Sequence, residues 1–479
     1  MNHVRRFGWM GLSAVLLACS GSDRSAPEWE ATGEIAEAAT CPDVSGTNGA
    51  RSLAVVDGTA LSKFGFARTV NRIRTTANVA STSTSLGIYQ RWMKTFGASA
   101  AAGDCDDPNM DPNDYDLVCP RTNELLLSAV NPFAATSAVT FQPVAIMNRF
   151  DLAPANGATC GEYRIVYAMS STDPAISGRA FIIFEAALPN PTPALGLEAC
   201  LPVAQFWQAL SQDGSATSRA TKLEKFYFTG GAVPGFAPAV DAAHYGLAQQ
   251  AATQRTPGQV RTNFFVNSVE WHLREFKLRR NCTAPADVST CSLSFEHVTV
   301  KENPAEELFG GGHPRSEAFV TNFLSQVPLL AASNVNLIKM KTGANFNEFE
   351  SISQAEAVRY AVAGVTNTST RDAIKQKLTS IGSTLTVNNI LERATTQTCA
   401  GCHQVSNNVP LGGGLTWPST TGFVHVDEQK ALSPALTTTF LPRRKVVLER
   451  FINDRCDGST PSPVAEGMTV GGSPEGSAN

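Results

Sequence analysis

Two cysteines and a histidine at fixed spacing, Cys399-Ala400-Gly401-Cys402-His403, constrain this chain more than any other feature. At this spacing two thiols can each add to a vinyl group of one haem, while the imidazole lies beneath the iron as its proximal ligand. The segment predicts one covalently attached c-type haem, held by Cys399 and Cys402 and ligated by His403. A Cys399–Cys402 disulfide and half of a zinc site are the alternative interpretations.

A sixth iron ligand is expected downstream of this motif. His425 lies in an apolar segment, residues 422 to 426, which a run of three glycines joins to the motif. Its neutral imidazole would fill the sixth position and favour electron transfer over small-molecule activation. Met468 is the weaker candidate because it lies in a tail rich in Pro, Gly and Ser. An open sixth position, suited to oxidase or peroxidase chemistry, and a structural role for His425 remain alternatives.

The N-terminus predicts secretion and lipid attachment. Basic residues lead into an apolar segment, residues 7 to 18, which is too short to span a membrane as a mature helix. Leu-Leu-Ala then precedes Cys19, and this order resembles the lipobox of bacterial lipoproteins. The resemblance implies a signal peptide over residues 1–18, lipid on Cys19 and an extracytoplasmic protein. Ser20 lacks the Asp associated with inner-membrane retention, which favours the outer membrane. Ordinary secretion without lipid is the alternative.

The cysteine count fits an oxidising compartment. Of eleven cysteines, lipid takes Cys19 and haem takes Cys399 and Cys402, which leaves an even set that can pair completely. A disulfide between Cys399 and Cys402 would preserve the same parity. Proximity and position in the chain favour four pairs: Cys105–Cys119, Cys282–Cys291, Cys160–Cys200 across a pair of strands, and Cys41–Cys456 between the two ends.

Composition predicts a folded protein without a nucleic-acid partner. The chain of 479 residues is 43% hydrophobic and 17% charged and carries a net charge of −4. It has no basic stripe of the kind that binds nucleic acid. No apolar run beyond the signal is long enough to cross a bilayer, so membrane attachment would rest on the lipid at Cys19.

Hydrophobic periodicity predicts an α+β fold. Residues 60 to 95 have the apolar spacing of two helices with a buried aromatic stripe, and residues 140 to 187 form short β-rich runs. Helical spacing resumes at 316, and the last such helix, 387 to 395, leads directly into the cysteines. We expect a large mixed domain followed by a small, mainly helical or irregular cytochrome c-like module. The predicted order is signal peptide 1–18, flexible tether 19–50, α+β domain 51–384, haem module 385–457 and disordered tail 458–479.

Two polar clusters carry weaker signals. Arg149, Arg164 and Glu185 lie on strands otherwise suited to burial and predict a cross-strand ion-pair network, with a polar pocket as the alternative. The acidic segment from Asp104 to Asp116 suggests calcium. However, Pro112 stands where a calcium loop requires Gly, so a solvated turn is the favoured interpretation.

Three further segments accompany the cysteine motif: Phe423-Val-His-Val426, Met147-Asn-Arg-Phe-Asp-Leu152 and Cys160-Gly-Glu-Tyr-Arg-Ile-Val166. Together with the motif they resemble a group of uncharacterised bacterial lipoproteins with one haem-type motif near the C-terminus. The resemblance implies this location and architecture and no known substrate. We predict a lipid-anchored monohaem protein that transfers electrons to or from an unknown redox partner. The alternatives are a haem oxidase or peroxidase and a non-haem, disulfide-bonded surface lipoprotein that binds a partner.

Overall fold

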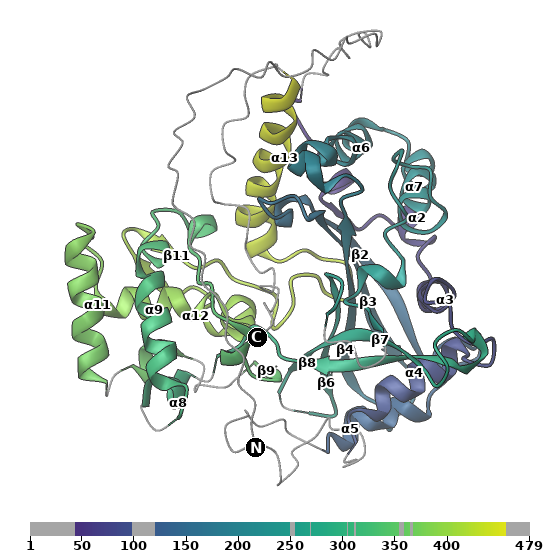
Figure 1. Cartoon of the computed structure of the whole chain (residues 1–479), viewed down its shortest axis with the longest axis horizontal. Helices are drawn as coiled ribbons and strands as arrows, with labels where there is room; N and C mark the ends of the chain where they lie inside the picture. The colour runs from purple at the N-terminus through teal and green to yellow at the C-terminus, as the bar shows by residue number, and fades with distance from the viewer. Residues whose placement is uncertain are drawn as a thin grey trace, which may run out of the picture. The chain divides into compact units, whose positions relative to one another are not determined.

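One large sheet with helices on both faces organises the chain (Figure 1). This arrangement confirms the predicted α+β class. No helix among the described residues is long and apolar enough to cross a membrane. The computed structural model describes residues 44–97, 120–249, 254–268, 270–303, 305–310, 313–353, 359–364 and 367–456.

Nine strands of the described residues form this sheet, in the order β1-β2-β3-β4-β6-β7-β5, with β8 and β9 also paired to β7. Its pairs are antiparallel except for the parallel pair of β5 with β7. The β-rich runs predicted between residues 140 and 187 are β2, β3 and β4. The strands are β1 (Ala54–Val55), β2 (Val139–Arg149), β3 (Thr159–Ser171), β4 (Gly178–Pro189), β5 (Ala248–Gln249), β6 (Gln259–Val266), β7 (His272–Cys282), β8 (Cys291–Val298) and β9 (Glu350–Ile352).

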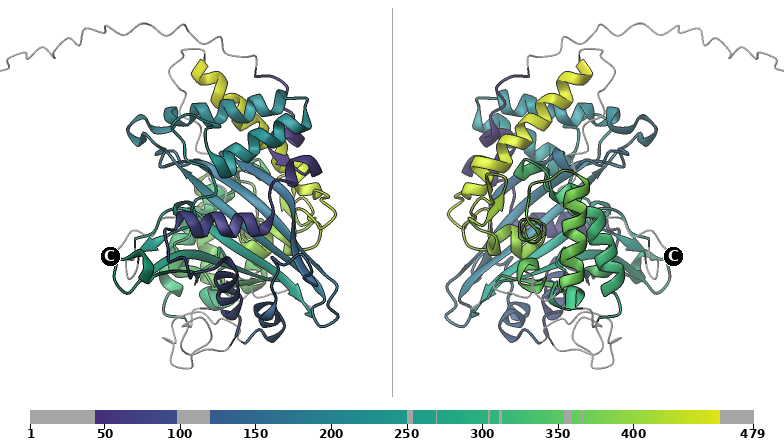
Figure 2. Two further views of the ribbon diagram at one scale, coloured as in Figure 1. Left: turned by 90° about the vertical axis from the view of Figure 1, so that its right-hand side faces the viewer. Right: turned by 90° about the vertical axis from the view of Figure 1, so that its left-hand side faces the viewer.

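The two faces of the sheet belong to different hydrophobic cores, because successive side chains of a strand point to opposite faces. On β2, Ile146 belongs to one core and Met147 to another, and Ile165 and Val166 of β3 divide in the same way. Helices of the N-terminal half cover the first face (Figure 2, left). They are α1 (Gly49–Ser52), α2 (Gly58–Leu61), α3 (Phe66–Thr76), α4 (Ser85–Lys94), α5 (Thr122–Leu125), α6 (Leu201–Gln212) and α7 (Ala216–Glu224).

A second group of helices lies on the other side of the sheet (Figure 2, right). Their core runs in sequence from Ala305 to Trp417, so the module boundary predicted at residue 385 falls inside it. The last of them, α12, has the bounds predicted for the helix before the cysteines, and its N-terminus carries a capping box of Thr386 and Asn389. The group comprises α8 (Ala305–Gly310), α9 (Ser316–Leu330), α10 (Tyr360–Ala363), α11 (Thr368–Ser380) and α12 (Val387–Thr395), followed by β10 (Pro410–Gly412) and β11 (Leu415–Thr416). The long α13 (Leu441–Cys456) instead packs against α6, and its buried residues belong to the first core.

Packed structure begins before the end of the predicted tether, because Val44 and Thr47 are already buried. Arg51, where order was expected to start, lies within α1. Val44 and Thr47 are ordered because they pack against the domain. Val44 belongs to the first core, and the hydroxyl of Thr47 lies 2.7 Å from Oε1 of Gln208 on α6.

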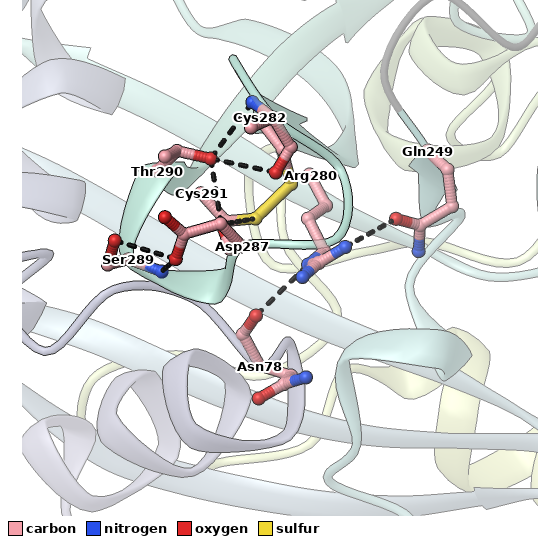
Figure 3. Close-up of a disulfide and its surroundings, with 9 residues drawn as sticks. Asn78, Gln249, Arg280, Cys282, Asp287, Ser289, Thr290 and Cys291 are labelled. Atoms are coloured by element: carbon pink, nitrogen blue, oxygen red, sulfur yellow. Dashed lines mark hydrogen bonds between the residues drawn. A yellow bond between two sulfur atoms is a disulfide. The ribbon is translucent and has the colours of Figure 1, made fainter.

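Two of the predicted disulfides, Cys160–Cys200 and Cys282–Cys291, are present. The second joins β7 to β8 beside Arg280, which donates a hydrogen bond of 3.0 Å to the carbonyl of Asn78 (Figure 3). The remaining predicted pairs stay predictions. Cys19, Cys41, Cys105, Cys119, Met468, the acidic segment and the tail lie outside the described residues, as does the side chain of Cys456.

Candidate functional site

The cysteine motif lines a cavity of about 230 Å³ on the second face of the sheet. Cys399, Cys402, His403 and His425 all contribute to its lining. The residues that the sequence assigns to haem attachment and ligation, Met468 aside, therefore lie together.

One wall of the cavity is the sheet itself. Each of four adjacent strands contributes two residues that are two positions apart, as expected when one face of a sheet forms a surface. The antiparallel register places Met147 opposite Arg164 and Ile183 opposite Arg261, so charged and apolar side chains are neighbours across this wall. The eight residues are Met147 and Arg149, Arg164 and Val166, Phe181 and Ile183, and Arg261 and Asn263.

Helix α13 and the π-helical turn before it, η11 (Ala435–Phe440), supply another wall. The residues that face the cavity recur every three or four positions, which places them on one side of a continuous helix. They are Leu436, Phe440, Arg443, Arg444 and Val447.

Backbone contacts fix the turn that carries the cysteines. The amide of Cys399 donates to the carbonyl of Lys301 at 2.9 Å, and the amide of Ala400 donates to Oε2 of Glu302 at 2.8 Å. Gly401 has no room for a side chain, because a Cβ there would lie 1.7 Å from the carbonyl oxygen of Thr395. The segment after α12 is therefore held against the loop that precedes α8.

Both cysteines are free thiols that are partly exposed to the cavity. Burial raises the pKa of Cys399 to about 12 and that of Cys402 to about 11, so both thiols are protonated at neutral pH. This state differs from the alternative prediction of a Cys399–Cys402 disulfide.

The two histidines meet in the cavity, with ring centroids 4.5 Å apart. Nδ1 of His425 lies 3.0 Å from the Ser433 hydroxyl, and its Nε2 lies 3.9 Å from the Cys402 sulfur. Nδ1 of His403 is buried and has no hydrogen-bond partner among the described residues. Burial, with Arg261 and other cations nearby, lowers the pKa of His403 to about 4. Burial also lowers the pKa of His425, so both imidazoles are neutral, the form that binds metal.

The charged wall forms the ion-pair network that the sequence predicts, with one change of partner. Arg164 pairs with Glu185 at 3.0 Å, as expected, whereas Arg149 pairs with Asp151 at 2.9 Å. Arg149 and Arg164 also line the cavity, so the predicted network and the alternative of a polar pocket are both present.

Sequence reasoning missed several residues of the site: Arg261, Lys301, Glu302, Arg443 and Arg444. The sequence pattern could have indicated Arg261, because polar residues at every second position of β6 (Gln259, Arg261 and Asn263) predict one polar face of that strand. No comparable pattern marks Lys301 or Arg444 as facing the motif.

Comparison with known proteins assigns no family to this chain. No protein-family model, curated protein or solved structure matches it.

The residues present fit a c-type haem. Two free thiols and two neutral imidazoles share the cavity, and one imidazole nitrogen there has no partner among the described residues. Apolar side chains such as Val166, Phe181 and Leu436 line the same space, as a porphyrin requires. Among the described residues, no set of three or more His, Cys, Asp and Glu side chains is placed to hold a metal ion. Haem does not need such a set, because the porphyrin supplies four of the ligands.

Proposed function

We propose that this chain is a lipid-anchored, extracytoplasmic monohaem c-type protein that transfers electrons. The observation that carries the proposal is the convergence of Cys399, Cys402, His403 and His425 in one cavity. These are the two thiols needed for covalent attachment and two imidazoles able to ligate one iron. In this proposal the segment from residue 385 to 457 acts as a cytochrome c-like module whose cavity wall is the sheet.

The chain's own residues would hold the haem in a defined orientation. When bound, haem supplies one-electron chemistry at its iron. Ser433 fixes the ring of His425 through Nδ1, which leaves Nε2 directed into the cavity. The rings of His403 and His425 are in contact, and both imidazoles would hold the iron once it is bound. Ligation by His425 would favour electron transfer over the oxidase or peroxidase alternative, which needs an open iron.

The membrane attachment in this proposal rests on the sequence alone. The lipobox-like segment before Cys19 supports a lipid anchor, and Ser20 supports the outer membrane. The redox partner would reach the haem from the extracytoplasmic side.

Haem staining tests the proposal directly. The protein is expressed with haem-attachment machinery and run on a denaturing gel stained for haem peroxidase activity, beside the double variant Cys399→Ala/Cys402→Ala. We expect a stained band in the parent, no band in a double variant of Cys399 and Cys402, and an unchanged band after Cys282→Ala/Cys291→Ala. No band in properly secreted parent protein would overturn the haem assignment.

The sixth ligand is tested on the same material. We expect His425→Ala to keep the covalent haem but to lose the low-spin absorption spectrum of bis-histidine iron. A low-spin spectrum unchanged by His425→Ala would remove His425 as a ligand and leave the covalent attachment intact.

A further inference from the structure

The cavity carries more positive than negative charge. Among the described residues that line it and their ion-pair partners, six cations face four carboxylates, an excess of two positive charges. Glu302, buried behind the cysteine turn, accepts hydrogen bonds from Ala400 and Ser351 rather than from a cation. The cations are Arg149, Arg164, Arg261, Lys301, Arg443 and Arg444, and the carboxylates are Asp151, Glu162, Glu185 and Glu275.

The carboxylates are already engaged by three of these arginines. Nε and Nη2 of Arg149 donate to Asp151 at 3.0 and 2.9 Å. Arg164 pairs with Glu162 and Glu185, and Arg261 pairs with Glu185 at 2.9 Å and with Glu275 at 2.7 Å. The remaining cations therefore find no free carboxylate in this wall.

Arg444 and Lys301 are the cations that most need an anion. The Arg444 side chain is only 11% exposed, and its one ion pair with a described residue is a 3.9 Å contact to Asp151, which Arg149 already holds. Lys301 also lines the cavity and forms no ion pair with a described residue. Burying an uncompensated cation is costly, so a site of this kind is stabilised by an anionic ligand.

Both cations act on the same part of the cavity. Both line the space into which Cys399 and Cys402 open, Arg444 from α13 and Lys301 from the loop whose carbonyl accepts the amide of Cys399 at 2.9 Å. A guanidinium and an ammonium that reach one cavity from two separate segments of the chain suit two separate carboxylates better than one.

We propose that Arg444 and Lys301 bind two carboxylate groups carried by one ligand in this cavity. The inference rests on the proposed function where the ligand is haem, whose two propionates supply the carboxylates. A free dicarboxylate has the same chemistry, and the experiment separates the two sources.

The test uses the full chain with Cys399→Ala and Cys402→Ala, which cannot attach haem covalently but keeps both histidines. It is titrated with haem and with haem dimethyl ester, in which both carboxylates are blocked. We expect haem to bind at least about tenfold more tightly than the diester, because each charge-assisted hydrogen bond contributes to affinity. Adding Arg444→Gln or Lys301→Gln should remove most of that difference, whereas Arg450→Gln, exposed on the same helix, should not.

Each outcome bears on one of the two proposals. Equal affinity for haem and diester would overturn the carboxylate site and leave the haem proposal standing. Binding of succinate to the haem-free protein, lost in Arg444→Gln, would support the site with a free dicarboxylate as its ligand. Binding of neither haem nor succinate would overturn the site, and the gel stain on the parent would decide the haem proposal separately.

A second measurement covers the case in which the double cysteine variant does not fold. In the covalently loaded protein, Arg444→Gln removes a positive charge beside the haem and should lower its midpoint potential relative to Arg450→Gln. Arg444→Lys keeps the charge and should restore most of the potential. Identical potentials in all three variants would overturn the role of Arg444.

Discussion

Gly401 holds the turn between the two cysteines in a space that admits no side chain. Because an added Cβ would lie 1.7 Å from the backbone oxygen of Thr395, the turn must move to accept any other residue. We expect Gly401→Ala to destabilise the protein by about 3 kcal/mol, the upper range for overpacking. Urea unfolding followed by circular dichroism measures the change. Gly214→Ala, where a Cβ meets nothing within 4 Å, is the matched control, and equal midpoints for the two variants would contradict this account.

Glu302 makes stability depend on pH. Burial raises its pKa from 4.5 to about 7, and its Oε1 has no hydrogen-bond partner among the described residues. The folded protein therefore keeps this proton up to about pH 7, whereas the unfolded chain loses it above about pH 4.5. The stabilisation is complete below pH 4.5 and is lost as the pH rises through 7, a change of about 3 kcal/mol.

Glu302→Gln should remove this pH dependence. A glutamine can accept the hydrogen bonds from Ala400 and Ser351 through its amide oxygen and cannot ionise. Thermal unfolding between pH 5 and pH 8 should show a smaller fall in stability for Glu302→Gln than for the parent. Glu306→Gln, at an exposed position of α8, is the control and should keep the parent's slope. A parent slope retained in Glu302→Gln would assign the titration to another group.

At the scale of elements, Arg393 joins α12 to two neighbours. Its side chain is 1% exposed and donates hydrogen bonds to four backbone carbonyls: those of Leu330 and Ala332 at the end of α9, and those of Leu411 and Gly412 in β10. Arg393→Met keeps most of the apolar stem but leaves these carbonyls without their donor. We expect a loss of at least about 3 kcal/mol in urea unfolding. Lys375→Met, exposed on α11, should cost far less, and a similar cost would refute the role of Arg393.

The two described disulfides should differ in their contribution to stability. Cys160–Cys200 spans 40 residues and Cys282–Cys291 spans 9. Loop-closure entropy predicts about 4 kcal/mol for the longer loop and about 2.6 kcal/mol for the shorter one. Paired alanine variants compared by urea unfolding in oxidising buffer measure both values. A larger loss from the 282–291 pair would show that strand pairing of β7 with β8, rather than chain entropy, dominates.

Helices and strands could be predicted where the hydrophobic pattern lies within one short segment. The walls of the cavity could not be predicted from the sequence. Helix α12 follows from helical spacing within residues 387 to 395. The cavity instead depends on the register of four strands and on contacts between distant segments, such as the 2.8 Å hydrogen bond from Asn263 to the carbonyl of Phe423. Hydrophobic periodicity contains no information on such pairings. His425 could be proposed because it follows the motif closely, whereas Arg444 reaches the cavity only through the placement of α13.

At the scale of the whole molecule, the cysteine motif depends on the sheet. Ala400 and Phe423 share a core with residues of β2, β3 and β4, and Arg179 of β4 forms an ion pair of 2.6 Å with Glu428. The described residues from Val44 onward form one compact unit. The segment that the sequence predicts as a separate haem module, 385–457, therefore buries much of its apolar surface against residues outside it.

A fragment of residues 385–479 should consequently fail to fold by itself. Without β2, β3, β4 and β6 it lacks one wall of the cavity, and without α8 to α11 its α12 loses the second core. We expect no cooperative thermal transition and rapid cleavage by chymotrypsin, whereas a chain of residues 44–456 should resist the protease and unfold cooperatively. Because haem attachment can precede folding, the haem stain alone does not report on this prediction. A cooperative transition in the fragment would establish the module as an independent domain. The sheet would then line the cavity but would not be required for the module to fold.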